Sequence, residues 1–318
     1  MFKAGIIGAA GYTGGELIRL LLHHPEVDIT FVHSNSQAGK PVYDTHDDLV
    51  GETELIFTDH LDVNVEVLFL CMGHGKAKAW LAENPVPEET LLIDLSHDFR
   101  LDANWVYGLP ELNKSQIQQT RRIANPGCFA TAIQLGLLPL AKAQLLQDEV
   151  HIHAITGSTG AGQSLSETSH FSWRNNNISV YKAFNHQHLA EIGQSLRQLQ
   201  PNHDKTLNFI PVRGDFTRGI FASMYVNCDL NEAQLNELYH DFYQDATFTT
   251  VTAQNPHLKQ VVNTNKCIVH VEKHGDKAFI ISMIDNLLKG ASGQAVENMN
   301  LALGIDPCAG LKLKAGFF

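Results

Sequence analysis

Residues 4–15 read Ala-Gly-Ile-Ile-Gly-Ala-Ala-Gly-Tyr-Thr-Gly-Gly, and this stretch decides the fold of the first part of the chain. Its apolar beginning predicts a short strand, and an amphipathic helical pattern follows the glycines and ends before Pro25. Glycines between a strand and a helix let the backbone approach a pyrophosphate, while the helix N-terminus offers N–H donors. The spacing over Gly8–Gly14 is GxxGxxG, and a tight structural turn is the alternative interpretation.

Strand and helix patterns alternate from this point as far as residue 127. The runs 67–72 and 91–95 are continuously apolar, as in strands that helices cover on both faces. This alternation predicts a doubly wound, Rossmann-type α/β domain with a parallel sheet over residues 1–127.

The pattern changes after Cys128. A long helix is predicted as far as about residue 146, with a kink or break at Pro139, and longer alternating strands follow. We therefore expect an α+β catalytic and dimerisation domain with a mostly antiparallel sheet over residues 128–290. The C-terminal segment 291–318 is expected to contain a helix that packs back on the first domain.

The composition excludes several classes of protein. The 318 residues carry a net charge of −11 and no basic block, so nucleic-acid binding is not expected. No segment approaches the run of about 20 apolar residues that a membrane span needs. The five cysteines are scattered without a CxxC pair, which suits a reducing cytoplasm, and no secretory signal pattern precedes the first strand. We expect a cytoplasmic enzyme with a small-molecule substrate.

The end of the second predicted strand indicates which dinucleotide the first domain binds. An NAD site usually places an acidic residue there, about twenty residues after the glycines, to bind the ribose hydroxyl. This chain has Ser34, Asn35 and Ser36, followed by Lys40. Small hydroxyl donors and a cation favour NADP, because an acidic residue would repel its additional phosphate.

Cys128 is the candidate nucleophile. The chain reads Asn-Pro-Gly immediately before it, and a helical pattern begins at the cysteine itself. The N-terminus of a helix favours thiolate over thiol, so this sulfur is expected to be nucleophilic at neutral pH. The alternative for Cys128 is a buried, unreactive thiol at a helix start. We interpret the cysteines in or beside predicted strands as buried packing residues.

A nucleophilic thiol needs a group that carries protons and a group that stabilises an oxyanion. His186 and His188 precede a predicted helix, and their spacing points the two rings in different directions, so at most one should face the thiol. The Gly/Ser/Thr-rich loop 156–162 offers N–H and hydroxyl donors, although a flexible connection is as consistent with its composition. Arg213 and Arg218 are candidates to bind a carboxylate or phosphate.

Taken together, these motifs resemble those of the N-acetyl-gamma-glutamyl-phosphate reductases, which belong to the semialdehyde dehydrogenase superfamily. The resemblance covers nearly the whole chain. Its most specific parts are Gly-Ala-Ala-Gly-Tyr-Thr-Gly at 8–14, Asp-Leu-Ser-His-Asp-Phe-Arg at 94–100, Tyr-Gly-Leu-Pro-Glu at 107–111, Asn-Pro-Gly-Cys-Phe-Ala-Thr-Ala at 125–132, the 156–162 loop, His-Gln-His-Leu-Ala-Glu-Ile at 186–192, Arg-Gly-Ile at 218–220 and Asp-Asn-Leu-Leu-Lys-Gly at 285–290.

The resemblance implies an NADPH-dependent reduction of an acyl phosphate to a semialdehyde, through a cysteine thioester, in arginine biosynthesis. It implies that Cys128 is the nucleophile and His186 the acid/base, and that the enzyme is a homo-oligomer, a dimer or a tetramer. We assign cofactor binding to Gly8, Ala10, Gly11, Tyr12, Thr13, Gly14, Ser34, Ser36 and Asn286. We assign substrate binding to Arg100, Asn125, Ser158, Gly160 and Arg218, and no residue to a metal.

The sequence departs from the family pattern at two positions. Many relatives have proline where Ala130 and Ala190 stand, which concerns the shape of the loops and not the reacting groups. Reductases of an N-succinyl-glutamyl, aminoadipyl or aspartyl phosphate are the alternatives within the superfamily. A redox-sensing NADP-binding protein is the alternative outside it, and the helpers around Cys128 argue against that role.

Overall fold

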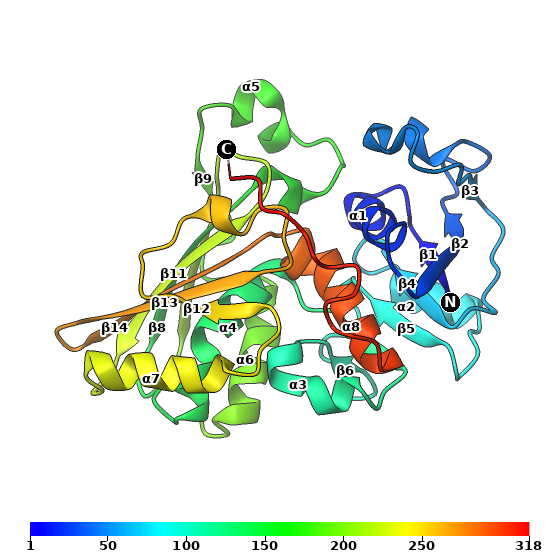
Figure 1. The fold of residues 1–318 in the computed structure, drawn as a ribbon. Helices are drawn as coiled ribbons and strands as arrows, with labels where there is room; N and C mark the ends of the chain where they lie inside the picture. Colours follow the sequence, from blue (N-terminus) through cyan, green and yellow to red (C-terminus); the bar gives the residue numbers. More distant parts are fainter. Residues whose placement is uncertain (318) are drawn as a thin grey trace. The chain divides into compact units, whose positions relative to one another are not determined.

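The computed structural model describes residues 1–317 and contains two compact units (Figure 1). The first unit comprises Met1–Gly127 and Ala291–Lys312, and the second comprises Cys128–Gly290 and the residues from Leu313 onward. The tail from Leu313 therefore groups with the second unit, whereas the sequence led us to expect it with the first. A backbone hydrogen bond from Gly316 to Val262 (3.2 Å) holds the tail there.

The first unit is built on a parallel sheet with the strand order β3-β2-β1-β4-β5-β7-β6. Its strands are β1 (Phe2–Ile7), β2 (Val27–His33), β3 (Phe57–Thr58), β4 (Val67–Leu70), β5 (Leu91–Asp94), β6 (Val106–Tyr107) and β7 (Arg122–Ala124). The strand order reverses between β1 and β4, and in such sheets ligands bind beyond the carboxyl ends of the strands at that point. Every residue of β4 and of β5 is buried, as the apolar runs predicted.

Helices complete the first unit: α1 (Tyr12–Leu21), α2 (Ala77–Glu83), α3 (Pro110–Ile117) and α8 (Gly293–Leu303). The C-terminal helix α8 packs against α1, α3 and β5. Its residues from Gly293 to Ala302 are all buried, although several are polar. One of them, Asn298, donates to the carbonyl oxygen of Gly108 (2.8 Å) and so replaces water as a partner.

The second unit is built on a mixed sheet with the order β12-β13-β14-β11-β8-β10-β9. Its strands are β8 (Val150–Thr156), β9 (Ser179–Val180), β10 (Leu207–Arg213), β11 (Ile220–Asn227), β12 (Thr249–Val251), β13 (Cys267–His274) and β14 (Lys277–Ile284). The pairs β8–β10 and β12–β13 are parallel, and the others are antiparallel. The predicted fold class, a doubly wound parallel sheet followed by an α+β unit with a mostly antiparallel sheet, is thus confirmed.

The helices of the second unit are α4 (Cys128–Lys142), α5 (Phe171–Arg174), α6 (His188–Leu199) and α7 (Glu232–Tyr243), and α4 packs against β11, β14 and α6 (Figure 1). Pro139 does not break α4, which continues to Lys142. The helix nevertheless ends before the predicted residue 146, because Gln144 adopts a left-handed conformation (φ 60°) that stops it.

Short helical turns connect these elements. The 3₁₀ turns are Val42–Asp44, Asp47–Leu49, Ser158–Ala161, Glu167–Ser169 and Leu258–Gln260, and Leu288–Ser292 forms a π-helical turn. Among residues 1–317, no helix is both long enough and apolar enough to cross a membrane.

Candidate active site

Cys128 is the first residue of α4 and its side chain is partly accessible. The first N–H groups of a helix have no partner within the helix, so the start of α4 presents donors next to this sulfur. Among the other cysteines, Cys228 and Cys267 are buried. Burial raises the pKa of the Cys71 thiol to about 12, which makes it a poor nucleophile.

Gly290 packs directly against Cys128. A Cβ atom at position 290 would lie 2.9 Å from the Cβ atom of Cys128 and 3.2 Å from its Cα atom. Such distances are shorter than real Cβ contacts, so any side chain at Gly290 would displace the cysteine. Gly290 therefore leaves room for the start of α4 in the second unit.

His186 lies beside the residue that follows the nucleophile. Its ring makes an edge-to-face contact with Phe129, with ring centroids 5.6 Å apart. The backbone N–H of His188 donates to Nδ1 of His186 (3.2 Å), so Nδ1 carries no proton and the neutral ring carries it on Nε2. Burial, and to a lesser degree the Lys182 cation, lower the pKa of His186 to about 4. At neutral pH, His186 is therefore an uncharged donor through Nε2.

His188 does not point away from His186 as the spacing suggested. The two rings, at the start of α6, contact each other edge to face with centroids 4.6 Å apart. Both also pack on Phe129 of α4. Nε2 of His188 lies 3.8 Å from the buried carboxylate of Glu191, one turn along the helix. His188 is thus held within its own helix, and His186 is the one of the pair whose Nε2 is left for a reacting group.

The 156–162 loop uses its N–H groups within the chain. The amides of Gly157, Ser158 and Thr159 donate to the carbonyl oxygens of Gly219 (2.9 Å), Phe216 (2.8 Å) and Thr217 (3.1 Å). Gly160 and Gly162 donate to carbonyls inside the loop itself. These amides are therefore not available to an oxyanion, contrary to the role that the sequence suggested. The carbonyls that bind them come from the connection between β10 and β11.

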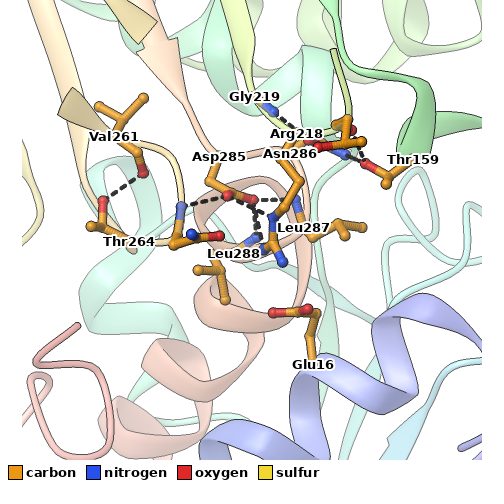
Figure 2. A network of polar contacts seen from close by, with 12 residues as sticks. Glu16, Thr159, Arg218, Gly219, Val261, Thr264, Asp285, Asn286, Leu287 and Leu288 are labelled. Atoms are coloured by element: carbon orange, nitrogen blue, oxygen red, sulfur yellow. Dashed lines mark hydrogen bonds and ion pairs between the residues drawn. The ribbon is translucent and has the colours of Figure 1, made fainter. Parts of the chain in front are cut away.

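Figure 2 shows the polar network that anchors this loop. The Asn286 amide accepts from the N–H of Gly219 (2.7 Å) and donates to the hydroxyl of Thr159 (3.0 Å). Both ends of the side chain that we assigned to the cofactor are thus engaged within the second unit. We infer that Asn286 fixes the loop.

The neighbouring Asp285 carboxylate is fully buried and holds Arg218 in a bidentate ion pair, at 3.0 and 3.1 Å (Figure 2). It also accepts from the N–H groups of Asn263 (2.8 Å), Leu287 (2.8 Å) and Leu288 (3.1 Å). Arg218, which we assigned to the substrate, therefore has its guanidinium oriented by Asp285.

In the first unit, Arg100 and Asn125 brace the turn that precedes the nucleophile. Nε of the buried Arg100 donates to the carbonyl oxygen of Asn125 (2.9 Å). The Asn125 amide donates to the carbonyl of Ala291 (3.0 Å) and accepts from Asn298 (3.0 Å). Both residues were assigned to the substrate, and the structure gives them contacts that shape the Asn-Pro-Gly turn.

The glycine loop of the first unit leaves its amides open. Gly8 and Ala9 donate to the carbonyl of His33. By contrast, the amides of Ala10, Tyr12 and Thr13 donate to no backbone carbonyl among residues 1–317, and α1 has no side-chain N-cap. Open amides at a helix N-terminus are what a pyrophosphate requires, so these residues fit a nicotinamide dinucleotide.

Glycine is required at two positions of the same loop. A Cβ atom on Gly8 would lie 2.9 Å from the backbone of Cys71, at a positive φ of 80°. A Cβ atom on Gly14 would lie 2.6 Å from the Cα atom of Ala9. A Cβ atom on Gly11 would make only an ordinary contact, 3.7 Å from the carbonyl oxygen of Gly8, so sterics do not require glycine there.

Two serines lie at the end of β2, where the cofactor's ribose would be expected. The hydroxyls of Ser34 and Ser36 lie 3.4 Å apart, and Nζ of Lys40 donates to the side chain of Gln37 (3.1 Å). The hydroxyls and the cation that favoured NADP in the sequence thus follow β2 within a few residues, with Ser34 buried and Lys40 exposed. Among residues 1–317, no cluster of three or more His, Cys, Asp or Glu side chains has an arrangement that would hold a metal ion.

Comparisons with known proteins identify the family of both units. Residues 3–120 match the family model for the NAD binding domain of semialdehyde dehydrogenases, and residues 128–286 match the model for their dimerisation domain. An N-acetyl-gamma-glutamyl-phosphate reductase of Christiangramia forsetii is 57% identical over 321 residues, and the match covers 100% of each chain. Enzymes of the same name from Flavobacterium johnsoniae and Bacteroides thetaiotaomicron are 58% and 56% identical, with the same full coverage.

This chain belongs to the N-acetyl-gamma-glutamyl-phosphate reductase family. Membership of this reductase family confirms the predicted family, the oxidoreductase class and the nicotinamide dinucleotide cofactor.

Solved structures of other semialdehyde dehydrogenases share the fold of this reductase-family chain. Aspartate semialdehyde dehydrogenase II of Vibrio cholerae, in complex with ASA, aligns with a TM-score of 0.77 at 17% identity, over 96% of this chain and 98% of that one. The aspartate semialdehyde dehydrogenase of Candida albicans, solved with NADP, aligns with a TM-score of 0.71 at 14% identity, over 95% and 98%. At such identities the likeness concerns the fold alone.

Tyr181 also belongs to this site, although no sequence motif indicated it. The ring of Tyr181 lies 6.0 Å from that of His186, and burial together with the nearby Cys128 raises the pKa of Tyr181 to about 12. No local pattern marks this tyrosine, because it follows the two-residue strand β9. The structure reveals it through the backbone bond from Tyr181 to Pro211 (3.1 Å), which places it beside β10.

Proposed function

We propose that this chain catalyses the NADPH-dependent reduction of N-acetyl-gamma-glutamyl phosphate to the semialdehyde, with release of phosphate, in arginine biosynthesis. The observation that carries the proposal is the pairing, in the second unit, of a partly accessible Cys128 at a helix start with a neutral His186 beyond Phe129. A thiol in such a position suits acyl transfer. The first unit contributes the cofactor loop, and the second contributes the reacting groups.

The reaction begins at the sulfur of Cys128. The thiolate attacks the γ-carbonyl carbon, a C–S bond forms, the bond from carbon to the phosphate oxygen breaks, and phosphate leaves with the electron pair. A thioester on Cys128 remains. Because five amides of the 156–162 loop donate to backbone carbonyls, we assign the oxyanion to the N–H groups in the first turn of α4. One such donor contributes about 3 kcal/mol to transition states of this kind.

His186 acts in the second half of the reaction. The bound cofactor supplies the hydride that reduces the thioester carbon. The resulting oxyanion accepts a hydrogen bond from Nε2 of His186, which already carries the proton because Nδ1 accepts from His188. Collapse of this species breaks the C–S bond, releases the semialdehyde and restores the thiolate. The neutral state of His186 therefore suits a donor that stabilises charge in each turnover.

We also propose that the enzyme is a cytoplasmic homo-oligomer, a dimer or a tetramer. The match to a dimerisation domain supports self-association. A series of large apolar side chains on the surface between residues 163 and 184 of this unit supports it as well: Leu165, Phe171, Ile178, Val180 and Phe184. The five free cysteines, which include the nucleophile, suit a reducing compartment.

The reverse reaction tests the proposed function. N-acetylglutamate semialdehyde should reduce NADP⁺ only when phosphate is present, because phosphate must cleave the thioester. Cys128→Ser should lose about 10⁴-fold or more in kcat, as removal of a nucleophile does elsewhere, while NADPH binding stays intact. Near-normal turnover by this variant, or a preference for aspartate semialdehyde, would contradict the proposal.

A further inference from the structure

Arg213 is the last residue of β10 and lies at the carboxyl end of that strand. It pairs with Thr156 at the end of β8 and with Ser179 in β9. Strands β8 and β10 are parallel, so their carboxyl ends lie at the same edge. This edge carries the 156–162 loop. From β9 the chain runs back along β10 toward His186, with Tyr181 bonded to Pro211 and Phe184 bonded to Phe209.

The Arg213 guanidinium has an unmet donor. Its Cζ atom lies 4.8 Å from the centre of the Tyr181 ring, and the Tyr181 hydroxyl hydrogen-bonds to its side chain. Nε of Arg213 is buried and has no hydrogen-bond partner. A buried donor on a charged group is costly to leave unpaired, and a guanidinium forms its strongest pairs with planar anions such as carboxylates.

Two neighbouring arginines do not share this condition. The buried Arg174 donates to the carbonyl oxygens of Thr168, Asn177 and Arg213, and Arg218 is paired with Asp285. Burial, followed by the Arg213 cation, lowers the pKa of Arg174. The two positively charged guanidinium groups therefore repel each other, and an anion bound to Arg213 would reduce this repulsion.

Tyr181 connects Arg213 to the reacting groups. Its ring contacts both the guanidinium, at 4.8 Å, and the His186 ring, at 6.0 Å, and burial followed by the nearby Cys128 raises its pKa. The backbone beyond it contains Lys182 and Phe184 with positive φ values of 47° and 59°. Non-glycine residues in this region are strained, and such strain concentrates at binding sites.

We propose that Arg213, positioned by Tyr181, binds a carboxylate of the substrate. The proposal rests on the proposed function, since the substrate is then an N-acylated glutamyl phosphate. The phosphate leaves from the carbon that Cys128 attacks. The printed contacts run from Phe129, which follows Cys128, to His186, from His186 to Tyr181, and only then to Arg213. The guanidinium therefore meets a part of the substrate away from the reacting carbon. That part is either the α-carboxylate of the glutamate or, if the acyl group is succinyl, the terminal carboxylate of that group.

Binding of N-acetylglutamate and N-succinylglutamate, measured by calorimetry, tests this role without turnover. We expect Arg213→Met to weaken binding by about 100-fold, the loss typical of one charged hydrogen-bonded pair, and Arg213→Lys to weaken it less. Arg197→Met, at an exposed position on α6, is the matched control and should bind as the parent does. Thermal unfolding of each variant establishes that it is folded.

The choice of ligand separates the two carboxylates. If Arg213 binds the α-carboxylate, the loss appears with both ligands. If it binds the succinyl carboxylate, the loss appears only with N-succinylglutamate. Unchanged binding of both ligands by a folded Arg213→Met protein would overturn the proposal.

Kinetics with a truncated substrate add a second readout. The parent should prefer N-acetylglutamate semialdehyde to 4-acetamidobutanal, which lacks the α-carboxylate, and Arg213→Met should lose that preference through KM if the α-carboxylate is bound. An equal fall of activity with both aldehydes would indicate a merely structural role and overturn the proposal. Absence of turnover in the parent, with binding still dependent on Arg213, would instead refute only the proposed function.

Discussion

The two glycine-rich loops of this chain look alike in sequence and differ in the fate of their N–H groups. Each loop follows a strand and combines glycines with small or hydroxylated residues. In the first unit, the amides of Ala10, Tyr12 and Thr13 bind no backbone carbonyl within residues 1–317. In the second unit, the amides of Gly157, Ser158, Thr159, Gly160 and Gly162 donate to backbone carbonyls of the same unit. A loop that can cradle a ligand is therefore identified by its unpaired donors, and composition alone does not identify it.

The largest effect is expected from crowding the open loop. In Gly14→Ala, the new Cβ atom would lie 2.6 Å from the Cα atom of Ala9, so α1 must shift against the loop. A shift of this size misaligns the helix N-terminus, and we expect the Kd for NADPH to rise by about 100-fold. Fluorescence titration measures the Kd, and thermal unfolding shows whether the variant is folded. An unchanged Kd would mean that the pyrophosphate does not bind at this loop.

The second effect concerns the anchor of the closed loop. Asn286→Ala removes the partner of the Gly219 amide and of the Thr159 hydroxyl. A buried donor left without a partner costs about 1–3 kcal/mol, so the free energy of unfolding should fall by that amount in urea titrations. The Kd for NADPH should stay the same. A weakened Kd without a change in stability would instead support the cofactor role that the family resemblance implied for Asn286.

A matched pair of alanines compares the loops directly. A Cβ atom at position 11 would make an ordinary contact at 3.7 Å, and one at position 160 would make a tighter contact at 3.3 Å with the side-chain hydroxyl of Thr156. Gly11→Ala should raise the Kd for NADPH by about tenfold, because it adds a methyl group between the open amides of Ala10 and Tyr12. Gly160→Ala should leave that Kd unchanged and alter stability by less than about 0.5 kcal/mol. Equal effects of the two substitutions on cofactor binding would remove the distinction between the loops.

The smallest effect is expected in the pH dependence of the rate of thioester reduction, the step in which His186 donates a hydrogen bond to the oxyanion. Burial lowers the pKa of His186 to about 4, so the folded enzyme keeps this ring neutral throughout the range from about pH 5.5 to 8. The rate of thioester reduction should therefore show no ionisation near pH 6.5 that His186→Gln removes. Single-turnover rates across this range measure it, and such an ionisation would assign His186 to proton uptake as a cation.

The same shift makes a prediction for stability. The unfolded chain binds a proton at His186 near the ordinary pKa of 6.5, whereas the folded chain binds it only near 4. The contribution of His186 to folding is therefore present above pH 6.5 and is lost progressively as the pH falls toward 4. The urea midpoint of the parent should fall more steeply across this interval than that of His186→Gln.

The sequence was sufficient for the fold because the signals are local. Apolar runs such as Val67–Leu70, the glycines after β1 and the Asn-Pro-Gly turn before Cys128 each specify an element within a few residues. Pro139 misled the prediction because the Leu135 carbonyl, which has no N–H donor at Pro139, accepts a hydrogen bond from the Tyr243 hydroxyl of α7 instead.

The site was less predictable because its contacts are distant in the sequence. Three of the carbonyls that accept from the 156–162 loop belong to Phe216, Thr217 and Gly219, and composition does not reveal such pairing. Tyr181 and Arg213 meet only because β9 adds to the edge of β10. Likewise, the tautomer of His186 depends on the hydrogen bond from His188, which requires the actual turn at the start of α6.

The carboxylate of Asp285 also has a consequence for the lifetime of the folded state. It gathers donors from Arg218, Asn263 and its own turn, and the ion pair with Arg218 spans 67 positions of sequence. Contacts between such distant segments require that the intervening loop is already closed, so we expect them to form after the main barrier to folding. Interactions of this kind slow unfolding more than they speed folding. Asp285 should therefore act mainly by lowering the unfolding rate of the second unit.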